Sequence, residues 1–275
     1  MNPLLQAEGV GIAYGRHKPV DQVSLSLGAG ELMVIVGPNG AGKTTLMKLL
    51  TGELAAGTGT IRLDGEPVGA IPAWRLAAMR AVMAQASRLA FPFSVAEVVR
   101  IGIDSVGRAL TRAERERIIA AALAAADIGH LAGRSYQTLS GGEQQRVQFA
   151  RTFAQLKAGR RASERQVLFL DEPVANLDLS HQIALMESAA RLARDGVGVI
   201  AVLHDLNLAV TFADQVAVMN RGRLHALGAA GAVITRDMVR DVFGVDLCRE
   251  AATSGGLPVV LPQNYAGTPV VLGAA

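Results

Sequence analysis

A glycine-rich stretch near the N-terminus has the residue types and spacing to hold phosphate groups. The stretch GPNGAGKTT, residues 37–45, fits the pattern G-x-x-x-x-G-K-[ST]. It follows the apolar run 32–36 and precedes 44–50, which favours a helix. Backbone amides of such a loop and the positive end of the helix dipole surround phosphate oxygens. Lys43 is expected to reach the β- and γ-phosphates, and the Thr44 hydroxyl to ligate Mg²⁺. The expected phosphate-binding residues are Gly37, Pro38, Asn39, Gly40, Ala41, Gly42, Lys43, Thr44 and Thr45.

Two adjacent carboxylates follow a second apolar run. Residues 167–170 predict a buried strand, and Asp171 and Glu172 come directly after it. Because ligands of α/β sheets bind at the carboxyl ends of the strands, both side chains are expected beside the phosphate loop. There Asp171 would hold the magnesium shell, and Glu172 would polarise the water that attacks the γ-phosphate. A third apolar run, 199–203, ends at His204, so an imidazole is expected at the same edge.

A second pair of glycines lies about a hundred residues after the phosphate loop, in the segment LSGGEQQR. Gly141 and Gly142 let backbone amides approach a phosphate, and Ser140 adds a hydroxyl suited to cap the helix predicted over 143–156. One chain therefore has two phosphate-binding helix N-termini, which is more than a single nucleotide needs.

In this order, the motifs resemble the ATP-binding cassette (ABC) family, and the resemblance covers residues 4 to 245. Ser140 begins a segment that resembles the family signature, and Asp178 ends one that resembles the D-loop. The resemblance implies ATP and Mg²⁺ as cofactors and ATP hydrolysis as the activity. It implies Glu172, His204 and Gln85 as catalytic residues, Thr44, Gln85 and Asp171 as magnesium ligands, and Tyr14, Ser140, Gly141, Gly142 and Asp178 as further nucleotide contacts, with Tyr14 stacked on adenine.

The same resemblance implies several partners. Ser140 and Gly142 would contact the γ-phosphate held by a second copy of the chain, in a head-to-tail dimer with two ATP molecules at its interface. Transmembrane permease subunits would bind the helical part, and a periplasmic binding protein would act indirectly. The protein would then lie at the cytoplasmic face of a bacterial inner membrane. Phe91 and Phe93 belong either to the docking groove for the permease or to the core of the helical part.

Four segments narrow the resemblance to one group of importers: FPFSVAEVV, GGEQQRVQFAR, HDLNLA and DVFGVDL. They resemble the cassette subunits of bacterial haem importers, and they are also similar to the ferric-siderophore and vitamin B12 group. A soluble cassette acting on DNA or ribosomes is a weaker alternative, because the chain has a single cassette and no sustained heptads. A P-loop kinase or GTPase leaves the LSGGEQQR segment and His204 without a role.

The alternation of predicted elements indicates an α/β fold: a P-loop NTPase core with a mostly parallel sheet, an N-terminal antiparallel β subdomain and an inserted α-helical subdomain. The remaining histidines, His17, His130, His181 and His225, are given ordinary structural roles. The predicted parts are an ABC ATPase domain over 4–245 with helical residues 87–151 inserted, a solvated loop over 157–166, a hairpin over 216–228, a closing helix over 235–243, and a C-terminal tail, 246–275, of uncertain structure.

Composition sets limits on location and partners. Mean hydropathy is +0.30 with 19% charged residues, yet no apolar run approaches the roughly 18–20 residues that cross a bilayer. The single cysteine, Cys248, rules out internal disulfides and is compatible with a reducing cytosol. Lysine and arginine number 27 against 24 acidic residues, which argues against a nucleic-acid surface, so no nucleic-acid partner is expected.

Overall fold

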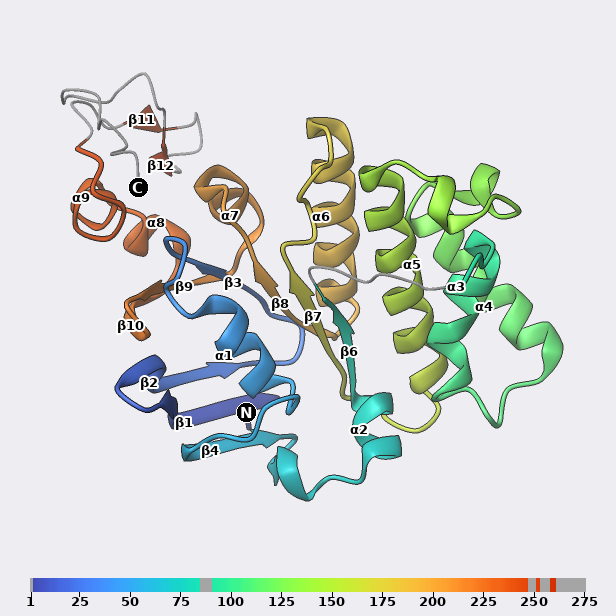
Figure 1. Cartoon of the computed structure of the whole chain (residues 1–275), viewed down its shortest axis with the longest axis horizontal. Coiled ribbons are helices and arrows are strands. Elements are labelled where there is room, and N and C mark those ends of the chain that lie inside the picture. Colours follow the sequence, from blue (N-terminus) through green and yellow to red (C-terminus); the bar gives the residue numbers. More distant parts are fainter. Residues whose placement is uncertain (1, 85–90, 247–250, 253–257, 261–275) are drawn as a thin grey trace.

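Two large sheets, a small two-stranded sheet and nine α-helices make up the described part of the chain (Figure 1). The computed structural model describes residues 2–84, 91–246, 251–252 and 258–260. The α/β class predicted from the sequence is confirmed. None of the helices in these residues is long and apolar enough to cross a membrane.

The first sheet is antiparallel and lies at the N-terminal end of the chain. Its strand order is β2-β1-β4-β5. The turn between β1 and β2 closes at Tyr14, which pairs with His17. The strands are β1 (Leu5–Tyr14), β2 (His17–Leu27), β4 (Thr58–Leu63) and β5 (Glu66–Pro67), and the 3₁₀ turn η1 (Val68–Ala70) follows them.

The second sheet carries the predicted phosphate chemistry. Its order is β10-β9-β3-β8-β7-β6, and β3 pairs in parallel with both β8 and β9. β3, β7 and β8 are buried along their whole length, as expected of strands covered on both faces. The strands are β3 (Leu32–Val36), β6 (Arg80–Met83), β7 (Val167–Asp171), β8 (Gly198–Val202), β9 (Gln215–Asn220) and β10 (Arg223–Gly228).

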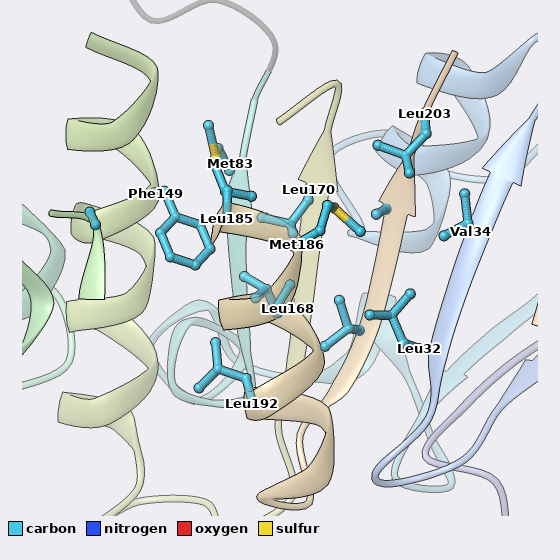
Figure 2. Close-up of a cluster of buried hydrophobic side chains, with 14 of the residues drawn as sticks. Leu32, Val34, Met83, Phe149, Leu168, Leu170, Leu185, Met186, Leu192 and Leu203 are labelled. Atoms are coloured by element: carbon cyan, nitrogen blue, oxygen red, sulfur yellow. The ribbon is translucent and has the colours of Figure 1, made fainter. Parts of the chain in front are cut away.

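Helices cover the two faces of this sheet differently. On one face, α1 packs between the two sheets through Leu46, Leu49 and Leu50. On the other face lie α5, α6 and α7. Figure 2 shows the resulting cluster, in which side chains of α5 and α6 meet those of the strands; the labelled residues are Leu32, Val34, Met83, Phe149, Leu168, Leu170, Leu185, Met186, Leu192 and Leu203. The helices are α1 (Lys43–Leu50), α2 (Ala73–Met79), α5 (Gly141–Gly159), α6 (Leu179–Arg194) and α7 (Leu206–Phe212).

Two further helices, α3 (Val95–Asp104) and α4 (Arg112–Ala125), pack against α5 beyond the β6 edge of the sheet (Figure 1). We call α3, α4 and α5 the helical lobe. A capping box begins α4, since the Thr111 side chain accepts from the backbone of Glu114. The 3₁₀ turns η2 (Gly129–Leu131) and η3 (Tyr136–Thr138) connect α4 to α5.

The helix α5 is longer than the sequence predicts. It begins at Gly141 and continues to Gly159, so residues 157–159 are its last turn rather than part of a solvated loop. Ala158 is buried there. Beyond the helix, Arg161 forms an ion pair with Glu114 at 2.6 Å. The prediction of a loop was wrong here because contacts with residues far away in the chain were not visible in its polar composition.

The C-terminal part closes the fold. The hairpin predicted over 216–228 is present as β9 and β10, and α8 (Ala230–Val233) and α9 (Arg236–Phe243) follow it. Thr235 caps α9, as its hydroxyl accepts from the backbone of Met238. A small antiparallel pair, β11 (Ala251–Ala252) and β12 (Pro258–Val259), lies next to α7.

Candidate functional site

The phosphate loop has a backbone that only glycine can adopt at its last position. Gly42 precedes α1 with φ +99°, and a Cβ atom there would lie 2.0 Å from the carbonyl oxygen of Pro19. The chain can therefore run directly from β3 into α1, so the first-turn amides of α1 face the loop. This is the geometry in which a helix N-terminus binds an anion.

Lys43 is buried at this N-terminus and is only 6% exposed. Its Nζ donates to two loop carbonyls, those of Gly37 at 2.8 Å and Pro38 at 3.0 Å. Desolvation lowers the pKa of Lys43, while the negative charges of Glu172 and Asp171 act in the opposite direction. The amine is thus held inside the loop, where a phosphate oxygen would be a stronger partner than a carbonyl.

Asp171 ends β7 as a buried carboxylate, 6% exposed. Within the part of the chain that the structure describes, its Oδ1 is buried without a hydrogen-bond partner. Burial raises the pKa of Asp171, the charge of Glu172 raises it further, and a hydrogen bond from Thr44 acts against the shift. A buried oxygen without a partner, beside a hydroxyl, is a donor set that fits Mg²⁺.

Glu172 and His204 meet, as the sequence predicted for residues at one sheet edge. His204 Nε2 lies 2.7 Å from Glu172 Oε1, a distance at which a protonated Nε2 donates to the carboxylate. Glu172 has a φ of +51°, which non-glycine residues rarely adopt. Asp205 accepts from the backbone of Leu208 at the start of α7, and so holds the segment that carries His204.

The loop and Glu172 border one cavity of about 260 Å³, which we call the phosphate-loop cavity. Glu172 lies in its wall, and Asp171 is hydrogen-bonded by Thr44 of the loop, so the structure brings both predicted carboxylates to the loop. His17 also lines the cavity, although no pattern in the sequence singles out this histidine. Its lining residues are His17, Pro19, Asn39, Gly40, Ala41, Gly42, Lys43, Thr44, Thr45 and Glu172.

The second glycine pair borders a different cavity, of about 390 Å³, which we call the signature cavity. Ser140 caps α5 in a capping box, because its backbone amide donates to Glu143 Oε2 at 2.7 Å and its hydroxyl accepts from the amide of Glu143. The expectation that Ser140 caps this helix is confirmed. The lining residues are Ser140, Gly141, Gly142, Glu143, Arg146, Asn176, Leu177, Asp178 and His181.

Asp178 lies in the signature cavity as the cap of α6. Its Oδ1 accepts from the His181 backbone at 2.9 Å and from the Ser180 hydroxyl at 2.8 Å, and it lies 2.7 Å from His181 Nδ1. These hydrogen bonds, that of the His181 backbone first, lower the pKa of Asp178 to about 2. Sequence reasoning missed His181, although its place three residues after an Asp cap was a usable signal.

Tyr14 does not line either cavity in the described structure. Tyr14 ends β1 with 57% of its surface exposed, and its stacking on adenine stays a prediction. Gln85 lies outside the described residues.

The ABC transporter family model matches residues 20–175, which is more than half of the chain. The chain belongs to the ABC transporter family. This ABC protein is 44% identical over 266 residues to the hemin import ATP-binding protein HmuV of Rhizobium johnstonii, an alignment that covers 97% of this chain and 100% of that protein.

Solved structures share the fold of this ABC protein. One is an inward-facing putative metal-chelate type ABC transporter, with a TM-score of 0.75, 23% identity and coverage of 94% of this chain and 98% of that one. Another is a dimeric ATP-binding cassette in a post-hydrolysis state with ADP and phosphate, with a TM-score of 0.71, 22% identity and coverage of 82% and 98%. At these identities the likeness shows the P-loop NTPase fold and no more.

Proposed function

We propose that this chain is the ATP-hydrolysing subunit of a bacterial ABC importer and that it energises uptake of hemin across the inner membrane. The observation that carries the proposal is the match over nearly the whole chain to a hemin import ATP-binding protein. The Glu172–His204 pair beside the phosphate loop supports the chemistry. The protein would lie on the cytoplasmic face, bound to transmembrane permease subunits.

ATP would bind with its phosphates in the phosphate-loop cavity. The amides of the loop and of the first turn of α1 donate to phosphate oxygens, and Lys43 exchanges the carbonyls of Gly37 and Pro38 for the β- and γ-phosphates. The Thr44 hydroxyl, Asp171 and Gln85 are the residues that would hold Mg²⁺. When bound, the ion neutralises charge that develops on the phosphates.

Glu172 is placed to act as the general base for hydrolysis. Its carboxylate accepts a proton from water as the water oxygen bonds to the γ-phosphorus and the bond to the β-phosphate oxygen breaks, which yields ADP and phosphate. His204, 2.7 Å from Glu172 Oε1, orients the carboxylate and is placed to contact the γ-phosphate. The 16% exposure of the Glu172 side chain leaves it accessible to a water molecule.

The two cavities support a head-to-tail dimer. Among the described residues, the phosphate-loop cavity and the signature cavity have no lining residue in common. Each ends on a helix N-terminus, so each chain offers two half-sites for phosphate. A two-fold axis would complete both nucleotide sites at once, with Ser140, Gly141, Gly142 and Asp178 of one copy facing the ATP held by the other, and Tyr14 stacked on adenine.

The edge of the helical lobe near Phe91 is suited to contact the permease. Phe91 is 67% exposed and packs edge-on against Phe93 at 6.2 Å, whereas Phe93 packs against the core. The exposure of Phe91 therefore favours a place in the docking groove, whereas the packing of Phe93 favours a place in the core of the helical part. The Tyr136 amide donates to the carbonyl of Phe93 at 2.9 Å, and Ser94 forms a β-bridge with Ser135. A movement of the chain near Phe91 would therefore be transmitted to residues 135–136, which precede Ser140.

Reconstitution tests the cargo. The chain would be co-purified with its permease subunits, placed in proteoliposomes and assayed for ATPase stimulation by binding protein loaded with haem, ferric siderophore or cobalamin. We expect haem to stimulate and the other cargoes to leave the basal rate unchanged. Stimulation by siderophore or cobalamin alone would support the importer assignment but refute hemin as the cargo. Recovery of the chain without any permease would overturn the importer.

A further inference from the structure

A glutamine of the signature helix contacts the backbone of the proposed general base. Gln145 lies on the second turn of α5, and its Nε2 donates to the carbonyl oxygen of Glu172 at 2.8 Å. The two residues are 27 positions apart in the chain. The Gln145 side chain is partly buried, so little water competes for this hydrogen bond.

The Glu172 backbone needs such support, because its φ of +51° is strained for a residue with a side chain. Strained backbone persists where the surrounding structure determines it at several points. The Glu172 amide donates to the carbonyl of Val202 on β8 at 3.2 Å, and its carbonyl also accepts from the amide of Ala175 at 3.3 Å. Gln145 adds a contact from α5, whereas Val202 and Ala175 belong to the core sheet and the loop after β7.

The start of α5 touches the same loop one turn earlier. A Cβ atom on Gly142 would lie 2.9 Å from the carbonyl oxygen of Asn176, so α5 and the loop are in close backbone contact there. Gly142 and Gln145 are three residues apart and therefore lie on the same face of the helix. The helix thus contacts the segment 172–176 at two levels.

We propose that Gln145 is a positioning residue that orients Glu172 and couples it to the signature end of α5. The proposal rests on the proposed ATPase function. Phosphate bound by Ser140 and Gly142 would come from the ATP of the partner copy, whereas Glu172 acts on the ATP held by its own chain. A shift of α5 when the partner's ATP binds would reach Glu172 through the Gln145 hydrogen bond. Occupancy of one site would then set the geometry of the base in the other.

The first test is Gln145→Met in the full-length protein, reconstituted with its permease. Methionine has a similar length but no N–H donor, so the helix stays packed while the hydrogen bond is lost. We expect kcat for ATP hydrolysis to fall about 10- to 100-fold, since a small displacement of a catalytic group has effects of this size. The KM for ATP should stay within about twofold, because the hydrogen bond of Gln145 goes to Glu172 and not to a residue of the phosphate loop.

Gln155→Met is the matched control. Gln155 lies on the same helix, is also partly buried, and donates through Nε2 to the carbonyls of Ala77 at 2.9 Å and Arg80 at 3.0 Å. A merely structural role would lower the thermal midpoint in both variants and leave their kinetics alike. Wild-type kcat in Gln145→Met, or equal losses of kcat in the two variants, would overturn the proposal.

A double-mutant cycle with Glu172→Gln separates this proposal from the function on which it rests. If Gln145 acts through the carboxylate, adding Gln145→Met to Glu172→Gln should not lower the residual rate further. Effects that multiply would contradict positioning. Wild-type turnover in Glu172→Gln alone would instead refute the general base. Loss of turnover in Glu172→Gln beside normal turnover in Gln145→Met would refute only the positioning role.

Discussion

Two charged side chains of the candidate site, those of Lys43 and Asp171, are buried. Lys43 and Asp171 are each only 6% exposed. Burial lowers the pKa of Lys43 and raises that of Asp171, and so favours the neutral form of each side chain. Asp171 Oδ1 is also buried without a hydrogen-bond partner among the described residues. Burying these charges destabilises the nucleotide-free protein, and a bound metal ion and phosphate would offset this unfavourable free energy.

The substitution Asp171→Asn tests whether the buried charge of Asp171 destabilises the protein. The amide keeps the shape of the side chain and removes the buried charge, so the free energy of unfolding of the nucleotide-free protein should rise by on the order of 1 kcal/mol near pH 7. The same variant should lose the stabilisation that ATP with Mg²⁺ gives the wild type. Thermal unfolding with and without Mg²⁺-ATP measures both effects. The exposed Asp195→Asn serves as control and should change neither.

The pH dependence of this effect has a definite sign. The folded pKa of Asp171 is raised above its ordinary value of 3.8, so the folded state binds more protons than the unfolded state between the two values. The contribution of Asp171 to the free energy of unfolding is fully present below pH 3.8, and it is lost as the pH rises through the folded pKa. The stability of wild type and Asp171→Asn should therefore converge toward pH 3.8 and diverge above it. A constant difference across the pH range would contradict a buried charge as the cause.

Among the elements, α5 is the helix of the lobe that contacts the segment carrying Glu172. All three lobe helices begin with a capping box, at Ser94, Thr111 and Ser140, and so each N-terminus is set within one residue. For α5 this matters most, because its first turn also packs on the loop after β7. The position of the helix is thus determined by its own cap and by the contact of Gly142 with Asn176.

Gly142→Ala and Gly141→Ala form a matched pair on this element. A Cβ at Gly142 would approach the carbonyl of Asn176 to 2.9 Å, while a Cβ at Gly141 would meet only the Asn176 side chain, at 3.8 Å. We expect Gly142→Ala to lower the thermal midpoint by roughly 2–8 °C, the effect of about 1–2 kcal/mol of strain in a protein of this size. Gly141→Ala should leave the midpoint unchanged. Equal midpoints for the two variants, measured by calorimetry, would show that α5 is not in close contact with the loop.

At the scale of the whole molecule, the C-terminal residues reach back to the helix that follows His204. Asn207 on α7 makes two hydrogen bonds to one residue: its Nδ2 donates to the carbonyl of Val260 at 3.2 Å, and its Oδ1 accepts from the amide of Val260 at 2.9 Å. Val260 also packs against the main core cluster. Through this contact, residues about fifty positions downstream stabilise α7.

Asn207→Ala should release this contact. Loss of two hydrogen bonds, each with a net value of about 1 kcal/mol, should raise the exchange rate of the Val260 amide roughly tenfold or more. Hydrogen exchange read by mass spectrometry on the C-terminal peptide measures the change. Thr211→Ala is the control, because the Thr211 hydroxyl donates to the Asn207 carbonyl at 2.8 Å and does not reach Val260. Unchanged exchange in Asn207→Ala would mean that the pairing does not persist in solution.

Local patterns in the sequence were sufficient for much of the fold and the site. The strand over 32–36, the hairpin turn near Asn220 and the caps at Thr111 and Ser140 all depend on residues a few positions apart, and all are present. The approach of Glu172 to His204 was also predictable, since adjacent parallel strands bring their carboxyl ends to one edge.

Other contacts join residues far apart in the chain and form only in the folded protein. The amide of Gln145 reaches Glu172, that of Asn207 reaches Val260, and Arg161 beyond α5 pairs with Glu114. A glutamine, an asparagine or an arginine reads in sequence as a polar surface residue, because its partner is a carbonyl or a carboxylate placed by other elements. The residue types and their spacing along the chain were enough to identify the side chains suited to phosphate chemistry. Packing of α5, α6 and α7 on the sheet decided how those residues are held, because hydrogen-bond geometry between distant segments exists only once the chain is folded.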